Sequence, residues 1–186
     1  MASITWNGTS GDWTDAADWN GGVVPGAADT ADFTGAGAYT VTLYSAVSVG
    51  GVVMDAANAL FYDAGSLTVA GTFSLQAGTF ALAYGSLNGG TLALAGGILA
   101  AEGGSLNGVA VQGALALTGQ NATLFVQDGL HMAGVGGGGA GSIQLTGSYA
   151  ALNFLGSQML ANANVSLGAT GVGNDQGGAE IGRAHV

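Results

Sequence analysis

The tripeptide Gly-Ser-Leu recurs three times in the middle of the chain at almost constant spacing. It stands at residues 65–67, 85–87 and 104–106, so that successive copies are 20 and 19 residues apart. A fixed period of this length is typical of a solenoid, in which each repeat buries its apolar side only against its neighbours. This repeat constrains the fold more than any other feature of the chain.

Each period is divided into shorter units in which two apolar residues, separated by one small or polar residue, are followed by glycine. Alternation of this kind places both apolar side chains on one side of a short strand. The regularly spaced inward pairs are Leu67 and Val69, Phe73 and Leu75, Phe80 and Leu82, and Leu115 and Leu117. Less regularly spaced pairs follow at Leu124 and Val126, Ile143 and Leu145, Leu152 and Phe154, and Val165 and Leu167.

The sequence therefore predicts an all-β fold, a parallel β-solenoid over residues 39–169, in the form of a right-handed β-helix. About seven coils of about 19 residues, stacked about 4.8 Å apart, would make a rod of about 33 Å. The alternative is an irregular β-sandwich, whose hairpins need a turn signal after every pair of strands. Asn-Gly or Asp-Gly occurs only at Asn88, Asn107 and Asp128 within the repeat, which favours the solenoid.

Composition supports this fold class and excludes several others. The chain has 37 glycines in 186 residues, and each one inside a helix would cost roughly 0.5–1 kcal/mol relative to alanine. It has no cysteine, so stability must come from backbone ladders and an apolar interior. No apolar run is long enough to cross a bilayer, so we expect no membrane insertion by this segment. The first residues lack the pattern of a secretory signal, so export would use another signal or one that lies outside this sequence.

The charge is strongly one-sided, with 11 acidic residues against one basic residue and a formal net charge of −10. Neutralising phosphates requires a Lys/Arg surface, which this chain lacks. We therefore expect no nucleic-acid partner. The same excess of negative charge favours solubility.

The last six residues, 181–186, are what ATC GGA AGA GCA CAC GTC encodes, the start of a common short-read sequencing adapter. We interpret them as sequencing-adapter read-through, preceded by an irregular tail at 170–180. On this interpretation the natural protein continues further, and its natural part here contains no Lys or Arg. An uncapped last coil would also favour edge-to-edge self-association.

Residues 1–38 differ from the repeat, because all three tryptophans and the only proline lie there. Large aromatic side chains can close the open end of a solenoid, so we predict an N-terminal Trp-rich and Asp-rich cap. A calcium site is an alternative role for its carboxylates. Their spacing follows no calcium-loop pattern, and turn-capping is the simpler role, so we assign no metal ligand among Asp12, Asp15, Asp18, Asp29 and Asp32.

Residues 5–43 resemble the Trp-rich opening module of large bacterial autotransporter-type and adhesin-type β-strand-repeat proteins. The resemblance rests on a first strand at 39–43 and on Trp6, Gly11, Trp13, Trp19, Gly22, Pro25 and Asp29. It covers about the first fifth of the chain closely and the remainder only in its glycine-rich strand-repeat style. The resemblance implies a surface or secreted protein, and it brings no catalytic residue with it.

Asn88 and Asn107 hold the same place in two copies of the repeat. If one period is one coil, their amides stack and can form a hydrogen-bonded ladder. The alternative is that each asparagine adopts a left-handed turn conformation.

Residues capable of catalysis are scarce. A carbohydrate-active β-helix enzyme would need two carboxylates facing one cleft, and the candidate pair is Asp63 with Glu102. His131 has no second native histidine or cysteine nearby in the sequence and is expected at the surface or in a turn. The glycine run 136–139 has no following lysine and is expected to leave the coil as a loop. We assign no catalytic or cofactor-binding residue and no cofactor.

These features predict a non-enzymatic structural or adhesive segment of a bacterial surface or secreted repeat protein, located outside the cell or on its surface. A host or surface ligand would bind loops such as 133–142 or regions outside this chain. The alternatives are the carbohydrate-active enzyme and a calcium-dependent binding module.

Overall fold

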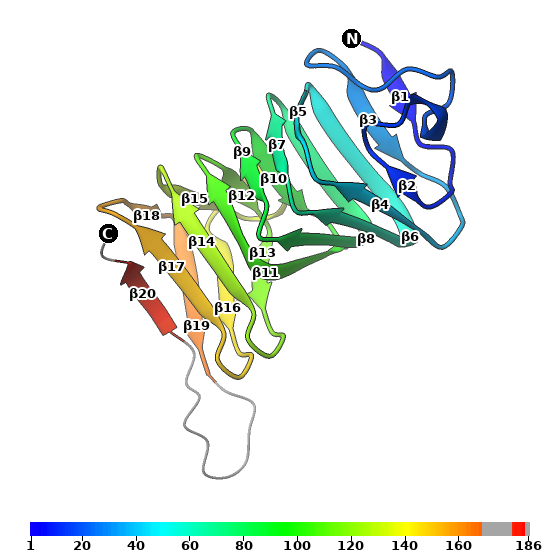
Figure 1. Ribbon diagram of the computed structural model, residues 1–186. Coiled ribbons are helices and arrows are strands. Elements are labelled where there is room, and N and C mark those ends of the chain that lie inside the picture. The colour runs from blue at the N-terminus through cyan, green and yellow to red at the C-terminus, as the bar shows by residue number, and fades with distance from the viewer. Residues whose placement is uncertain (169–179, 185–186) are drawn as a thin grey trace.

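The computed structural model describes residues 1–168 and 180–184, and it shows an all-β chain wound into a parallel β-solenoid (Figure 1). Coils stack in one direction, from the N-terminus at one end to the C-terminus at the other. Two 3-10 helices, η1 (Ala16–Asp18) and η2 (Val135–Gly137), are the helical elements of the described residues. The predicted β-solenoid is confirmed and the β-sandwich is excluded, because all ladders between the described strands are parallel and the one antiparallel contact is an isolated bridge between Trp6 and Trp19; the handedness stays a prediction.

Each coil contributes to three ladders, which form three faces of the rod. Three long strands cross a corner and belong to two faces each: β6 (Gly51–Asp63), β8 (Thr72–Ala83) and β11 (Ile98–Asn107). The first face contains the starts of β6 and β8 together with β1 (Ser3–Thr5), β3 (Thr30–Phe33), β10 (Thr91–Leu94), β12 (Ala110–Gln112), β15 (Leu130–Ala133) and β18 (Leu160–Ala161).

The second face contains the ends of β6 and β8, the start of β11, and β2 (Gly11–Asp12), β4 (Tyr39–Leu43), β13 (Ala114–Leu117), β16 (Gly141–Leu145) and β19 (Ala163–Leu167). The third face contains the end of β11 and β5 (Ala46–Val49), β7 (Ser66–Val69), β9 (Ser86–Asn88), β14 (Thr123–Gln127), β17 (Ala151–Leu155) and β20 (Glu180–Ala184).

The Gly-Ser-Leu repeat lies in register on the third face, so one period is one coil. The serines Ser66, Ser86 and Ser105 are consecutive ladder partners. The leucines stack directly beside them and are at most 1% exposed: Leu67, Leu87 and Leu106. The periodic spacing therefore gave the ladder register correctly.

The alternation of apolar residues is confirmed along most of the chain. The four regularly spaced pairs, together with Leu124 and Val126 and Ile143 and Leu145, are buried in one continuous core. Leu152 is buried as well, and Phe154 is partly buried against this core. Val165 and Leu167 differ, because β19 is the edge strand of the three-stranded sheet β13-β16-β19 and leaves them 40% and 60% exposed.

The asparagine ladder is confirmed. The Nδ2 of Asn107 donates to Oδ1 of Asn88 at 2.8 Å, and the Nδ2 of Asn88 donates in turn to the Ser66 hydroxyl at 3.0 Å. The left-handed alternative is wrong, since neither asparagine has a positive φ and the glycines that follow them, Gly89 and Gly108, supply it.

The tryptophans pack inside the N-terminal end of the core, as the cap prediction required. Trp13 is fully buried and stacks on Phe61 with ring centroids 5.2 Å apart. Trp19 meets Trp13 edge-on at 5.1 Å, and Trp6 meets Trp19 at 4.9 Å. Strand β1 pairs with β3, and β3 pairs with β6, so the cap shares its sheet with the repeat.

Coils toward the C-terminal end keep their ladders but carry longer loops. Between Thr123 and its partner Ala151 the chain takes 28 residues, part of which is the excursion around η2. The tail predicted at 170–180 lies outside the described residues except for Glu180, which begins β20. Strand β20 pairs with β17, and the adapter interpretation of 181–186 stays a prediction.

The repeated glycines are explained by close stacking of coils. A Cβ on Gly65 would contact the carbonyl oxygen of Ser45, and one on Gly85 would lie 2.6 Å from that of Asp63. Gly104 is equally confined, with the carbonyl oxygen of Leu82 at 2.7 Å. None of these positions has a positive φ, so glycine is required here because the neighbouring coil leaves no room.

This confinement predicts that Gly65→Ala lowers the free energy of unfolding by about 1–3 kcal/mol, because the added methyl group forces two coils apart. Gly138→Ala is the matched control, since a Cβ there meets nothing within 4 Å and its φ is −91°. That control should change stability by less than about 1 kcal/mol. Urea denaturation measures both, and equal effects would contradict the close-stacking explanation.

Candidate functional site

The acidic residues of the N-terminal region form turns and do not gather around a common point. Oδ1 of Asp12 accepts from the backbone N–H and the hydroxyl of Thr14, at 2.8 and 2.6 Å. Oδ1 of Asp15 accepts from the N–H of Ala17 and caps η1, while Oδ2 of Asp18 accepts from the N–H of Asp12. These carboxylates are therefore already used by the backbone.

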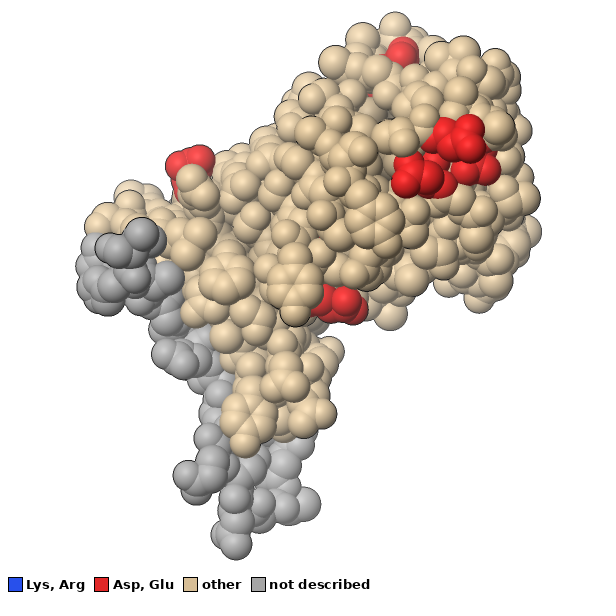
Figure 2. All heavy atoms as spheres, viewed as in Figure 1, with Lys and Arg blue, Asp and Glu red and all other residues tan. Residues whose placement is uncertain are grey.

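The remaining two aspartates of this region tie it to the first strand. Asp29 accepts from the N–H groups of Ala2 and Gly26, and these bonds hold the pKa of Asp29 below its usual value. Oδ2 of Asp32 accepts from the Ser3 hydroxyl at 3.2 Å. Within the described residues, no group of three His, Cys, Asp or Glu side chains is placed to hold a metal ion. Asp12 and Asp15 thus cap turns, whereas Asp29 and Asp32 bind the first strand and the residue before it. Figure 2 shows the largest acidic patch of the visible face over this end of the rod.

The candidate catalytic pair is not brought together. Asp63 is fully buried at the end of β6, whereas Glu102 is exposed on β11. Asp63 pairs with Leu82, and Leu82 pairs with Ala101, so the two carboxylates are two coils apart and on opposite sides of the wall. The arrangement offers no cleft in which both could act on one glycosidic bond. His131 is exposed on β15 beside Ala110, as expected for a surface histidine.

Asp63 is the one buried charged residue among those the structure describes. Its Oδ1 accepts from the N–H of Gly65 at 2.9 Å, and its buried Oδ2 has no partner. Burial raises the pKa of Asp63 to about 7, against the opposing effect of the Gly65 hydrogen bond. The sequence carried a signal for this position, because Asp63 lies two residues after the buried Phe61 and so points inward.

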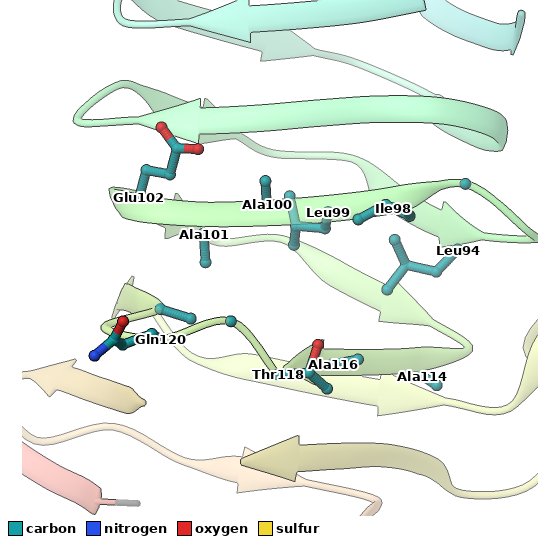
Figure 3. Close-up of a pocket in the computed structure, with 13 residues that line it drawn as sticks. Leu94, Ile98, Leu99, Ala100, Ala101, Glu102, Ala114, Ala116, Thr118 and Gln120 are labelled. Atoms are coloured by element: carbon teal, nitrogen blue, oxygen red, sulfur yellow. The ribbon is translucent and has the colours of Figure 1, made fainter. Parts of the chain in front are cut away.

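The second face contains a break that the sequence did not reveal. Strand β11 pairs with β8, β9 and β14, whereas β13 pairs with β16 alone, so no ladder joins β11 to β13. A slit of about 440 Å3 lies between them (Figure 3). We call this space the wall slit; its lining includes residues 97–102 of β11 and its approach, residues 118–120 of the following loop, Leu94, Ala114, Ala116 and Ala122.

The wall slit is closed at both ends. At one end a Cβ on Gly113 would lie 2.5 Å from the carbonyl oxygen of Leu94, and at the other Thr123 pairs with Glu102. Leu99 and Ala101 line the slit and are 7% and 6% exposed, so the core is covered less completely here than at most other core positions. The floor of the slit is therefore apolar.

Polar side chains stand at one end of the wall slit. Figure 3 shows the Glu102 carboxylate and the Gln120 amide at the same end, with Thr118 nearer its middle. A single carboxylate is present, so the slit has neither the second acid nor the base that hydrolysis requires. The lining suits binding better than catalysis.

Comparisons with protein-family models, with curated proteins and with solved structures returned no match to this chain. The candidate sites are therefore judged on geometry and chemistry alone.

Burial of Asp63 predicts that the protein becomes less stable as the pH rises. The folded state keeps a proton up to a pKa of about 7, whereas the unfolded chain releases it near 3.8. The folded state therefore binds more protons than the unfolded state between these values, and the free energy of unfolding falls across that range by on the order of 4 kcal/mol. Below about pH 4 the penalty is absent, and above about pH 7 it is complete.

The variant Asp63→Asn should lose this slope and be more stable than the wild type at pH 8, as measured by urea denaturation at pH 4.5 and pH 8. Asp55→Asn removes an exposed carboxylate from the same strand and should leave the slope unchanged. An unaltered slope in Asp63→Asn would show that other groups cause the pH dependence.

Proposed function

We propose that this chain is a structural, non-enzymatic segment of a bacterial surface or secreted repeat protein, whose coils hold other regions of that protein away from the cell. The observation that carries the proposal is the continuity of the third face, on which ladder follows ladder from β5 to β20. Each coil adds length without altering the cross-section, so length is what the architecture supplies.

The chemistry of the side chains supports the same proposal. Four of the five carboxylates of the N-terminal region bind backbone groups, Asp63 is enclosed, and the wall slit has one carboxylate. No helix among the described residues has the length and apolar character to cross a membrane. The resemblance of residues 5–43 to the opening module of autotransporter-type and adhesin-type proteins supports a location outside the cell or on its surface.

A carbohydrate-active enzyme is the competing function, and it predicts polysaccharide cleavage. We expect the purified protein to release no reducing ends from neutral or acidic polysaccharides, because no second carboxylate faces Glu102 in the wall slit. Reducing-end assays over pH 4 to 8 measure this directly. Cleavage that disappears in Glu102→Gln, with the fold intact by circular dichroism, would overturn the structural function.

A calcium-dependent module is the other competing function, and it predicts stabilisation by the ion. We expect the melting temperature to stay constant as calcium is raised into the millimolar range, since the turn aspartates already accept backbone hydrogen bonds. Magnesium at the same concentration controls for ionic strength. A rise specific to calcium that is lost in Asp15→Asn or Asp18→Asn would establish a site in this region.

A further inference from the structure

Four tyrosines mark one edge of the rod, the corner at which the second face turns into the third. Tyr44 follows β4 and is 65% exposed, Tyr84 follows β8 and is 86% exposed, and Tyr149 precedes β17 and is 50% exposed. Tyr62, near the end of β6, is half-buried, and its ring lies 6.3 Å from that of Tyr44. We call these four residues the tyrosine strip.

Two residues of the tyrosine strip hold an unfavourable backbone conformation. Tyr84 has a φ of 60° and Tyr149 a φ of 58°, in the left-handed region that bulky residues rarely occupy. In the two coils between them, Gly103, with a φ of 81°, lies next to Tyr84, and Asn121, with a φ of 58°, lies next to Tyr149. Glycine and asparagine suit this corner, so folding alone does not explain exposed aromatic rings at Tyr84 and Tyr149.

The strip adjoins the polar end of the wall slit. The N–H of Tyr84 donates to the carbonyl oxygen of Glu102 at 3.2 Å. Its ring lies over Gly103, where an added Cβ would be 2.9 Å from the ring edge. Glu102 therefore stands beside Tyr84, and Gln120 lies one coil further on, next to the coil of Tyr149.

This combination of groups has a specific chemical use. Aromatic faces pack against the C–H faces of sugar rings, while a carboxylate and an amide bind sugar hydroxyls as acceptor and donor. Residues 1–168 contain no Lys or Arg, so an acidic polymer would find no counter-charge here. A purely apolar partner that covered Glu102 and Gln120 would remove their hydrogen bonds to water without replacing them.

We propose that the tyrosine strip, with Glu102 and Gln120, binds a neutral polysaccharide chain that lies along the rod axis. The repeating coils place the rings at intervals along that axis, as an extended chain of sugar rings requires. The inference deepens the proposed function and rests on it, since binding without cleavage would make the rod an adhesive scaffold.

The test uses the full chain and three neutral hexasaccharides, namely cellohexaose, chitohexaose and maltohexaose, with polygalacturonate as the acidic probe. Isothermal titration calorimetry should detect binding of at least one neutral hexasaccharide and none of polygalacturonate. Tyr84→Gly should weaken that binding at least tenfold while its melting temperature stays equal or rises, because glycine relieves the left-handed strain. Tyr84→Asn, which also tolerates this conformation, should behave in the same way.

Tyr39→Phe is the matched control, since Tyr39 is buried away from the strip and should leave binding unchanged. The proposal is overturned if no neutral hexasaccharide binds, if Tyr84→Gly and Tyr84→Asn bind as tightly as the wild type, or if only polygalacturonate or an unrelated unstructured peptide binds. If no polysaccharide binds, the binding proposal is wrong and the scaffold function is unaffected. If a bound polysaccharide is cleaved, the scaffold function is wrong and the tyrosine strip remains a binding site.

Discussion

The structure depends on the close parallel stacking of one coil on the next. Backbone hydrogen bonds hold consecutive strands about 4.8 Å apart, and that spacing leaves no volume for a side chain wherever a corner of one coil lies over its neighbour. Gly65, Gly85 and Gly104 stand at such points, with backbone atoms of the previous coil where a Cβ would be. The glycine of the repeat is thus a packing requirement, and the leucine two residues later fills the core that the stacking creates.

Stacking also leaves an end that must be closed. At the N-terminal end the chain buries three tryptophans against Phe33 and Phe61, so that the large rings cover the first layer of the core. The polar atoms around them are mostly satisfied locally, since the indole N–H of Trp19 donates to the carbonyl of Trp13 and that of Trp6 to Thr9. The turn aspartates hold the loops that carry these rings, which explains why acidic and aromatic residues occur together there.

The fold was accessible from the sequence because it repeats. Alternation fixed which side of each strand is buried, and the spacing of Gly-Ser-Leu fixed the register from which the Asn88 and Asn107 ladder follows. Two features that occur only once in the chain could not be predicted from the repeat. The burial of Asp63 depends on where a strand meets its corner, and the wall slit depends on the 9 residues between Gly113 and Thr123, a segment that pairs with the following coil instead of the preceding one. The alternation along β6 points Asp63 inward, but no periodic pattern encodes the slit.

Only some positions of the rod are free to acquire a function. Inward positions are fixed by the core, and most outward positions on the faces are small or polar because they belong to ladders that must stay in register. Corner positions differ in this respect, because Gly65, Gly85 and Gly104 have no room for a side chain, whereas a left-handed corner residue such as Tyr84 needs only a chain reversal that fits above the previous coil. Glycine or asparagine would meet that need at every coil, and the chain has tyrosine at two of them instead. Tyr84 and Tyr149 are exposed, aromatic and conformationally costly and add little to the rod itself, and these properties are the ground for the proposed binding of a polysaccharide.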